Sequence, residues 1–304
     1  KIMASRLRAS GGFCGRVPAS LHRRLLSTSS KFTSGASVDF EEVEKFGRLA
    51  ERWWDPNGPQ SMLQLMNPSR IRYIRNRLGL QFSRAESSSG SLPLKGLRIL
   101  DVGCGGGFAS ESMARLGADV LGLDASEDAI GVAKQHATES GLMGDESSEY
   151  KLQYEHGVAE YLAEQKMQFD VVTALDIIEH VPEQTPFLCT CLSLVKPGGA
   201  MFVSTLNRTP LSYSLAIVAA EYVLRYVPTE THDWNKFVTP DELQAMVSHY
   251  EDYEVLNSLA SSEEDTAAIA LEDMSGIKYN PLKRRWGLDP NDLEVNYIAH
   301  ISKR

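Results

Sequence analysis

The feature that most constrains the fold is a glycine-rich segment directly after an apolar one, residues 99–107, with the sequence ILDVGCGGG. The mostly apolar run at 97–102 is typical of a buried strand in a parallel sheet. The glycines can adopt positive φ and allow a ligand to approach main-chain N–H groups closely. Residues 108–116 then have the pattern of a helix that ends at Gly117. The segment therefore predicts a strand–turn–helix unit with room for a ligand at its turn.

The spacing of the glycines distinguishes two kinds of nucleotide ligand. The dinucleotide pattern G-x-G-x-x-G would need a third glycine at position 108, which is Phe108. The chain has acid-x-Gly-x-Gly-x-Gly instead, with Asp101, Gly103, Gly105 and Gly107. This arrangement resembles motif I of the class I S-adenosylmethionine-dependent methyltransferases. A glycine turn that serves packing alone is the other interpretation of this segment.

A second acidic residue follows the next predicted strand. Asp124 stands at the end of an apolar run at 119–123. A carboxylate at this distance from the glycine turn can accept hydrogen bonds from both ribose hydroxyls of an adenosine. It can also cap the helix predicted to start near Ser126. These two roles are compatible, and both place Asp124 at the same edge of the sheet.

The order of the predicted elements indicates an α/β fold. We expect a doubly wound, mostly parallel, Rossmann-like methyltransferase sheet, with ligands at the carboxyl ends of the strands. We expect three parts: a transit peptide or disordered segment at 1–37, a helical cap at 38–92 that ends in a linker at 86–91, and a methyltransferase domain at 93–304. Within this domain, we expect residues 207–236 to form a lid or membrane-contact insertion, with an apolar helix after the fifth strand. The predicted elements are helices at 39–46, after Met62, at 126–140 and at 185–195, and strands at 97–102, 119–123, 150–155, 169–175 and 200–205.

Charge is distributed unevenly along the chain. Residues 1–38 hold seven of the 31 Lys and Arg and no Asp or Glu, so the remainder carries all 40 acidic residues against 24 basic ones. Such an acidic remainder is a poor partner for nucleic acid, and we expect none. The basic, Ser-rich first segment is typical of a mitochondrial transit peptide. A disordered basic tail is the alternative.

A cluster of polar residues follows the strand at 169–175. If this segment forms one helical turn, Asp176, Glu179 and His180 stand at i, i+3 and i+4 and face the same way. Two carboxylates and an imidazole can bind a hard metal ion, or the imidazole can act as a general base without a metal. The alternative is a solvated helix start with favourably placed acids and a structural histidine.

A resemblance to one family covers nearly the whole chain from Val38 onward. Several segments occur in the same order as in the ubiquinone-biosynthesis O-methyltransferases: RWWD at 52–55, NPSR at 67–70, DVGCGGG at 101–107, EHVP at 179–182, LVKPGG at 194–199, STLNR at 204–208, THD at 231–233 and DLEVNY at 292–297. The resemblance implies methyl transfer from S-adenosylmethionine to a phenolic hydroxyl of a polyprenylated dihydroxybenzoate or demethylubiquinol-type ring. It also leaves two alternatives open: a methyltransferase for another small molecule, and a non-catalytic quinone-binding scaffold subunit.

The resemblance also implies site residues and partners. It places the cofactor at Arg70, Gly103, Asp124 and Leu175, to which the glycine-turn argument adds Asp101 and Gly105. It places Mg²⁺ at Asp176, Glu179 and His180, which we also take as the catalytic residues. The first metal position is usually Glu in the family, and here it is the shorter Asp176. The implied setting is the matrix face of the mitochondrial inner membrane, as a peripheral protein, within a multi-subunit ubiquinone-biosynthesis complex.

One apolar segment lies outside the sheet pattern. Residues 211–227 are apolar over most of a helix, with Glu221 and Arg225 as interruptions. The segment is shorter than the roughly 20 residues that a spanning helix needs. It therefore predicts a helix in the membrane interface, beside the entrance for a polyprenyl substrate. A lid or a dimer contact without any lipid role is the alternative.

Overall fold

The computed structural model describes residues 38–82, 92–143, 151–223, 228–229, 231–261 and 268–304, and the side chains of 251–261 are not part of that description. The chain divides into two compact units, Lys1–Ala36 and Ser37–Arg304, and every described residue belongs to the second. The predicted transit segment at 1–37 and the predicted linker at 86–91 lie outside the described residues.

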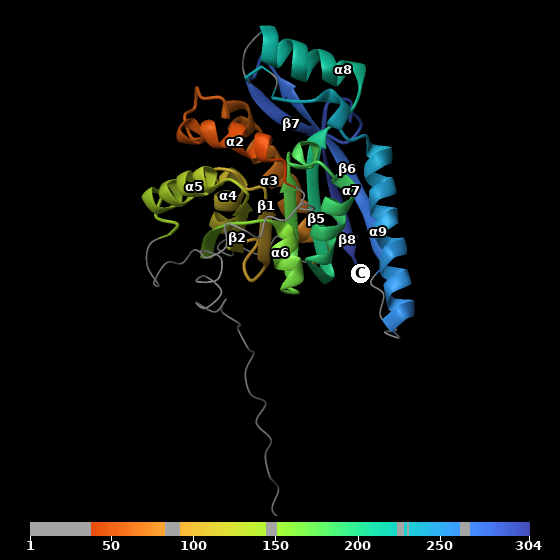
Figure 1. The fold of residues 1–304 in the computed structure, drawn as a ribbon. Helices are drawn as coiled ribbons and strands as arrows, with labels where there is room; N and C mark the ends of the chain where they lie inside the picture. Colours follow the sequence, from red (N-terminus) through yellow and green to blue (C-terminus); the bar gives the residue numbers. More distant parts are fainter. Residues whose placement is uncertain (1–37, 83–91, 144–150, 224–227, 230, 262–267) are drawn as a thin grey trace, which may run out of the picture. The chain divides into compact units, whose positions relative to one another are not determined.

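The second unit is built on one eight-stranded sheet in the order β3-β2-β1-β4-β5-β8-β6-β7 (Figure 1). Strands β1 to β5 are parallel, whereas β8 runs antiparallel between β5 and β6, and β7 pairs antiparallel with β6. The strands are β1 (Arg98–Val102), β2 (Asp119–Asp124), β3 (Lys151–His156), β4 (Phe169–Leu175), β5 (Val195–Leu206), β6 (Ile269–Asn280), β7 (Arg285–Asp289) and β8 (Asn296–Lys303). The predicted mostly parallel, Rossmann-like sheet is thus confirmed.

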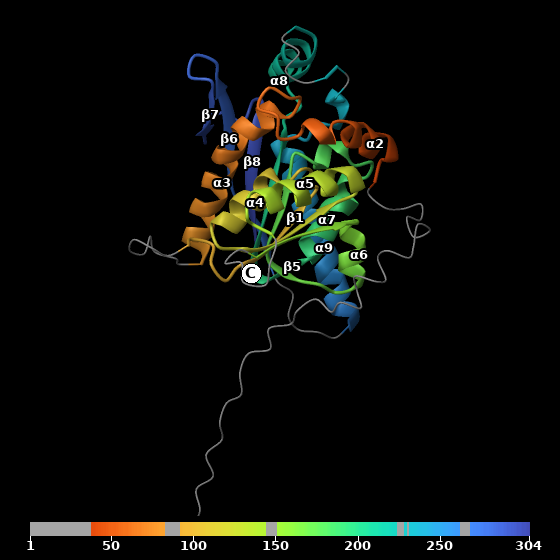
Figure 2. The ribbon, with the colours of Figure 1, turned by 90° about the vertical axis from the view of Figure 1, so that its left-hand side faces the viewer.

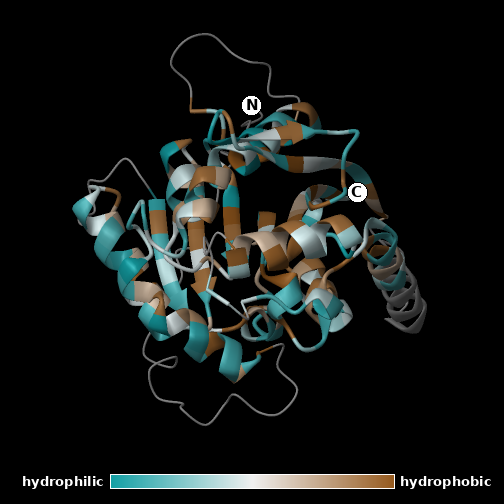
Figure 3. Cartoon of the chain, turned by 90° about the horizontal axis from the view of Figure 1, so that it is seen from above, coloured by the Kyte–Doolittle hydropathy of each residue, from teal (hydrophilic) through white to brown (hydrophobic). Residues whose placement is uncertain are grey.

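Helices cover both faces of this sheet (Figures 1 and 2). One face packs against α3 (Ser61–Gln81), α4 (Phe108–Arg115) and α5 (Glu127–Glu139), and the other against α6 (Ala159–Glu164), α7 (Gln184–Ser193) and α9 (Pro240–Ser261). Successive strand residues point to opposite faces of the sheet. Ile99 therefore packs in the apolar cluster on the face of α3, α4 and α5, and Leu100 in the cluster on the other face. Viewed from above, the hydrophobic colouring concentrates on the strands between the helical layers (Figure 3).

The predicted elements agree well with those observed, apart from their ends. The helix predicted at 126–140 is α5, for which Ser126 is the N-cap and accepts a hydrogen bond from the backbone N–H of Ala129 at 3.2 Å. Strand β5 begins at Val195, five residues before the predicted start. Strands β6 to β8 were not among the predicted elements. Polar residues such as Asp273, which lies at a register shift between β6 and β8, interrupt the apolar pattern of these strands.

The N-terminal helical cap consists of α2 (Phe40–Arg48) and the short helix η1 (Ala50–Arg52), followed by α3. Asp39 caps α2 by accepting hydrogen bonds from the backbone N–H groups of Glu41 and Glu42, at 3.1 and 3.4 Å. Because α2 packs against α5, it lies above the end of the sheet where β1 and β2 finish (Figure 2). The cap thereby becomes one wall of the pocket described below.

The predicted insertion forms a helix after β5, made of α8 (Pro210–Ser212) and the π-helical η3 (Tyr213–Val223). Figures 1 and 2 both show this α8–η3 helix at the end of the sheet where β5 finishes. Six of its residues are large, hydrophobic and exposed: Leu211, Tyr213, Leu215, Val218, Tyr222 and Val223. Within the described part of the chain, no helix is both long enough and apolar enough to cross a membrane.

Candidate functional site

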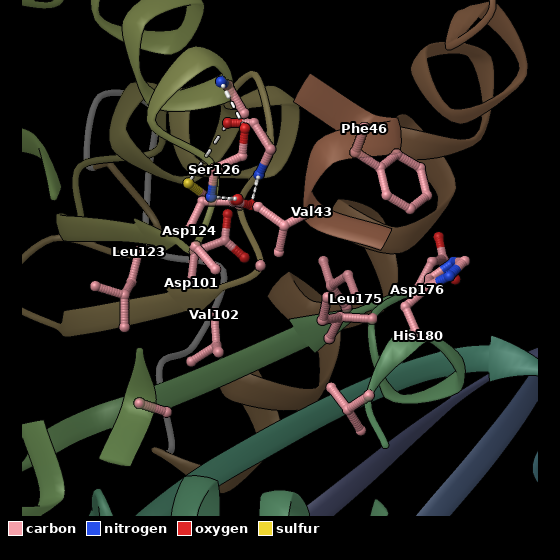
Figure 4. Close-up of a pocket in the computed structure, with 18 of the residues that line it drawn as sticks. Val43, Phe46, Asp101, Val102, Leu123, Asp124, Ser126, Leu175, Asp176 and His180 are labelled. Carbon is pink, nitrogen blue, oxygen red and sulfur yellow. Dashed lines mark hydrogen bonds between the residues drawn. The ribbon is translucent and has the colours of Figure 1, made fainter. Parts of the chain in front are cut away.

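A pocket lies at the carboxyl ends of β1, β2 and β4, beneath the cap helix α2, and encloses about 1140 Å³ of empty space that is open to solvent. Figure 4 shows that its labelled side chains fall into two groups. Asp101 and Asp124 lie at one end and Asp176 and His180 at the other, with Leu175 between them. We call these the glycine-turn end and the His180 end.

At the glycine-turn end, the backbone leaves no room for side chains. Gly105 has a φ of 52°, and a Cβ atom there would lie 2.2 Å from the Trp53 ring. Gly103, at a φ of 69°, also lines the pocket. Trp54 fixes the turn from outside: its indole N–H donates to the carbonyl of Gly106 at 2.9 Å. The main chain of the turn is thus covered by the two tryptophans of the cap.

The two acidic residues at this end have different roles. Asp101 is buried, and its carboxylate accepts hydrogen bonds from the hydroxyls of Ser110 at 2.5 Å and Thr173 at 2.7 Å. Asp124 accepts from the backbone N–H groups of Gly105 and Ser126, both at 2.8 Å. Burial raises the pKa of both carboxyls. Asp101 therefore supports the turn from behind, while Asp124 keeps lone pairs free for a ligand in the pocket.

At the His180 end, Asp176 is held by side chains from other elements. It follows β4 with a φ of 55°, a conformation that is uncommon outside glycine. One carboxylate oxygen accepts from an Arg70 N–H at 2.5 Å, and the other accepts from the Ser204 hydroxyl at 2.8 Å. The Arg70 side chain is 5 % exposed, and its Nε has no partner among the described residues. A buried guanidinium with a free N–H is suited to a carboxylate ligand.

Glu179 and His180 point to different partners. Glu179 is buried and accepts a hydrogen bond from the Thr205 hydroxyl at 2.8 Å. Burial and the charge of Asp176 raise the pKa of Glu179. His180 donates from Nδ1–H to a carboxylate oxygen of Glu42 at 2.9 Å. Its Nε2 is then the nitrogen that can accept a proton in the neutral ring.

We predicted that Asp176, Glu179 and His180 share one face of a helical turn, and the structure shows that this prediction is wrong. Only the last two belong to the short helix η2 (Ile178–His180), because Asp176 adopts a positive φ and is drawn to Arg70. Within the part of the chain that the structure describes, no three His, Cys, Asp or Glu side chains are grouped so as to hold a metal ion. As arranged here, the three side chains do not fit Mg²⁺.

Two pocket residues were not predicted from the sequence. Glu42, on α2, fixes the ring of His180, and hydrogen bonds from His180 and Lys45 lower its pKa to about 2, although burial opposes this. Trp53 packs on Gly105 and Gly106, and its buried indole N–H has no partner among the residues that the structure describes. The sequence carries a weak signal for each residue. Glu42 lies in the helical pattern at 39–46, and Trp53 belongs to a Trp–Trp pair just before a Pro and a Gly that end the helix.

Comparison with known proteins agrees with this geometry. Residues 100–203 match a family model described as a methyltransferase domain. A solved structure of magnesium protoporphyrin IX methyltransferase from Synechocystis PCC 6803, with bound SAH, superimposes with a TM-score of 0.53 at 16 % identity, covering 88 % of this chain and 97 % of that one. This likeness shows a shared fold.

Curated sequences are much closer. The ubiquinone biosynthesis O-methyltransferase of Dinoroseobacter shibae is 43 % identical over 88 % of this chain and 97 % of its own length. The protein of that name from Roseobacter denitrificans is 44 % identical over 86 % of this chain and 95 % of its own. Because the identity extends over almost the full length of these relatives, the chain belongs to the family of ubiquinone biosynthesis O-methyltransferases.

Proposed function

We propose that this methyltransferase transfers a methyl group from S-adenosylmethionine to a phenolic hydroxyl of a polyprenylated aromatic ring, a dihydroxybenzoate or a demethylubiquinol-type intermediate of ubiquinone synthesis. The observation that carries the proposal is the pocket itself. It joins a glycine turn with Asp124 at one end to an imidazole held by a carboxylate at the other. Membership of the family supports the phenolic acceptor.

The glycine-turn end fits the cofactor. Asp124 can accept hydrogen bonds from ribose hydroxyls, and Gly103 and Gly105 line the pocket without a side chain. Arg70, with its unpartnered Nε, can bind the cofactor's carboxylate, and Leu175 contributes an apolar wall. When bound there, S-adenosylmethionine supplies an electrophilic methyl group.

The His180 end provides the proton acceptor. A phenol has a pKa near 10 by analogy with tyrosine, so at neutral pH it is almost entirely protonated and a poor nucleophile. Because Glu42 holds Nδ1–H of His180, which lines the pocket, Nε2 is left as the hydrogen-bond acceptor of the ring. His180 can take the phenolic proton as the oxygen gains the methyl group. Burial lowers the pKa of His180, which keeps the ring neutral before the reaction.

Magnesium at Asp176, Glu179 and His180 remains a prediction from the resemblance alone. Binding of the ion would require the carboxylates to rearrange, because Asp176 is paired with Arg70 and Glu179 accepts a hydrogen bond from Thr205. The contact with Glu42 uses Nδ1 of His180 and leaves Nε2 as the possible metal ligand. No step of the mechanism above depends on the ion. Activity that is lost in EDTA and restored by Mg²⁺ would support it, and full activity in EDTA would remove it.

The test of the proposed reaction is methyl transfer in a purified system. The protein is incubated with labelled S-adenosylmethionine and a short-chain prenylated catechol, and the product is analysed for a new aryl methyl ether. We expect label on the ring oxygen. Label on a carbon or nitrogen atom would instead indicate another methyltransferase activity, and cofactor binding without transfer would indicate a scaffold subunit.

We further propose that the α8–η3 helix lies in a membrane interface, at the matrix face of the mitochondrial inner membrane, where the enzyme joins other subunits of ubiquinone synthesis. Its exposed apolar residues, such as Leu215 at 48 % and Val218 at 42 %, support this role. Leu215→Asp and Val218→Asp should each reduce flotation with liposomes. Unchanged flotation would favour a lid without a lipid role.

A further inference from the structure

The β6–β7 hairpin ends in a tip, residues 281–285, that is exposed throughout. It carries three consecutive cations, Lys283, Arg284 and Arg285, next to Leu282, whose side chain is 95 % exposed. Among the described residues, none of these three cations takes part in an ion pair. The hairpin tip is therefore a positively charged patch on a chain whose net charge is −9.

The tip stands on an ordered support. The rings of Tyr279 and Trp286 pack across the two strands with centroids 5.1 Å apart. The backbone N–H of Lys283 donates to the side-chain oxygen of Asn280 at 2.9 Å and closes the turn. Beside the tip, the Ser69 hydroxyl on α3 donates to the carbonyl of Trp286 at 3.0 Å. The cations are thus presented by a paired ribbon that is anchored to a core helix.

The hairpin tip and the α8–η3 helix lie at the same end of the sheet. Strands β5 and β6 both run antiparallel to β8, so they finish at the same edge. Figures 1 and 2 show the hairpin and the helix rising from this edge. The only charged side chain of the helix within 210–223 is Glu221, which is 1 % exposed. The helix therefore offers apolar surface without charge, and the hairpin tip offers charge.

We propose that the hairpin tip binds the phosphate groups of anionic lipids, beside the helix that enters the interface. This inference rests on the proposed function, in which the acceptor is a prenylated lipid. The membrane binding of an interfacial helix increases with its buried apolar area and with electrostatic attraction to anionic lipids. Each Lys or Arg held near an anionic surface favours binding about fivefold, so three give roughly a hundredfold.

The test compares two triple variants of the full-length protein in vesicle flotation. The first is Lys283→Gln, Arg284→Asn and Arg285→Gln; Asn is chosen because Arg284 has a φ of 46°. The control is Lys134→Gln, Lys151→Gln and Lys166→Asn, three exposed cations away from the hairpin, of which Lys166 has a φ of 53°. The vesicles are pure phosphatidylcholine, or equal parts of phosphatidylcholine and phosphatidylglycerol.

We expect the hairpin variant to lose about a hundredfold in binding to the anionic vesicles, whereas the control variant binds like wild type. Binding of all three proteins to the neutral vesicles should be the same. If the hairpin variant binds the anionic vesicles as well as the control does, the proposal is overturned. Methylation of a water-soluble prenylated catechol is measured in parallel, because failure there would refute the proposed reaction while leaving the vesicle result to be judged separately.

Discussion

The two ends of the pocket are held in place by different kinds of contact. At the glycine-turn end, Asp124 accepts hydrogen bonds from backbone groups of Gly105 and Ser126, 19 and two residues away in the chain. At the His180 end, the contacts run to the cap: Arg70 pairs with Asp176 across 106 residues and Glu42 with His180 across 138. The hydrogen bonds of Asp124 are therefore local in the chain, whereas those of Asp176 and His180 with Arg70 and Glu42 form only when the N-terminal helices are docked.

The proposed proton acceptor lies at the His180 end, so we expect the largest loss of activity there. Replacing His180 by Gln keeps a polar side chain but removes the base, and activity should fall by roughly 10²- to 10⁴-fold. Binding of S-adenosylhomocysteine should stay unchanged. Turnover with the prenylated catechol is the measurement, and His249→Gln, an exposed residue on α9, is the control. Equal activity of the two variants would remove His180 from the mechanism.

We expect the next largest effect from the ion pair between Arg70 on α3 and Asp176. Arg70→Met leaves Asp176 as a nearly buried carboxylate without its ion partner, at a cost of about 3–5 kcal/mol in the free energy of unfolding. Arg48→Met is the matched control, since it breaks the exposed pair with Glu44 and should cost less than about 1 kcal/mol. Chemical denaturation measures both. A similar small loss for each variant would show that the His180 end does not depend on this pair.

The local end should respond to backbone strain. Gly105→Ala forces a side chain into a positive-φ position and onto the Trp53 ring, which we expect to cost about 2–4 kcal/mol of stability. Gly131→Ala, in α5 with open space around it, should instead stabilise the protein by about 0.5–1 kcal/mol. Thermal unfolding measures whether the two changes in stability have opposite signs. Two changes of the same sign would contradict the crowding argument.

A buried imidazole outside the pocket gives the smallest effect. Burial lowers the pKa of His300, whose ring stacks on Phe202, to about 4. A lowered pKa means that the neutral folded form is favoured above pH 6.5 and that this stability is lost as the pH falls from 6.5 toward 4. Near pH 5.5 the loss should be about 1 kcal/mol relative to pH 7. His300→Gln should lose less over the same interval in denaturation experiments, and an equal loss would assign the acid sensitivity to other groups.

The same contrast explains what the sequence could predict. The glycine turn, Asp124 and strand β4 depend on neighbouring residues, so glycine spacing and apolar runs were enough to place them. The conformation of Asp176 depends on Arg70 and Ser204, which belong to distant segments. Helical spacing alone therefore predicted the wrong face for that residue. Glu42 was missed for the same reason, because its role appears only when α2 lies on the pocket.

The division of the pocket is tested most directly by calorimetric binding of S-adenosylhomocysteine to two variants. Asp124→Asn removes the carboxylate at the glycine-turn end, and His180→Gln removes the imidazole at the other. The account predicts that Asp124→Asn weakens binding about tenfold or more, as expected for loss of a hydrogen bond to a charged group, while His180→Gln binds like wild type. Weaker binding by His180→Gln, with Asp124→Asn unaffected, would contradict it.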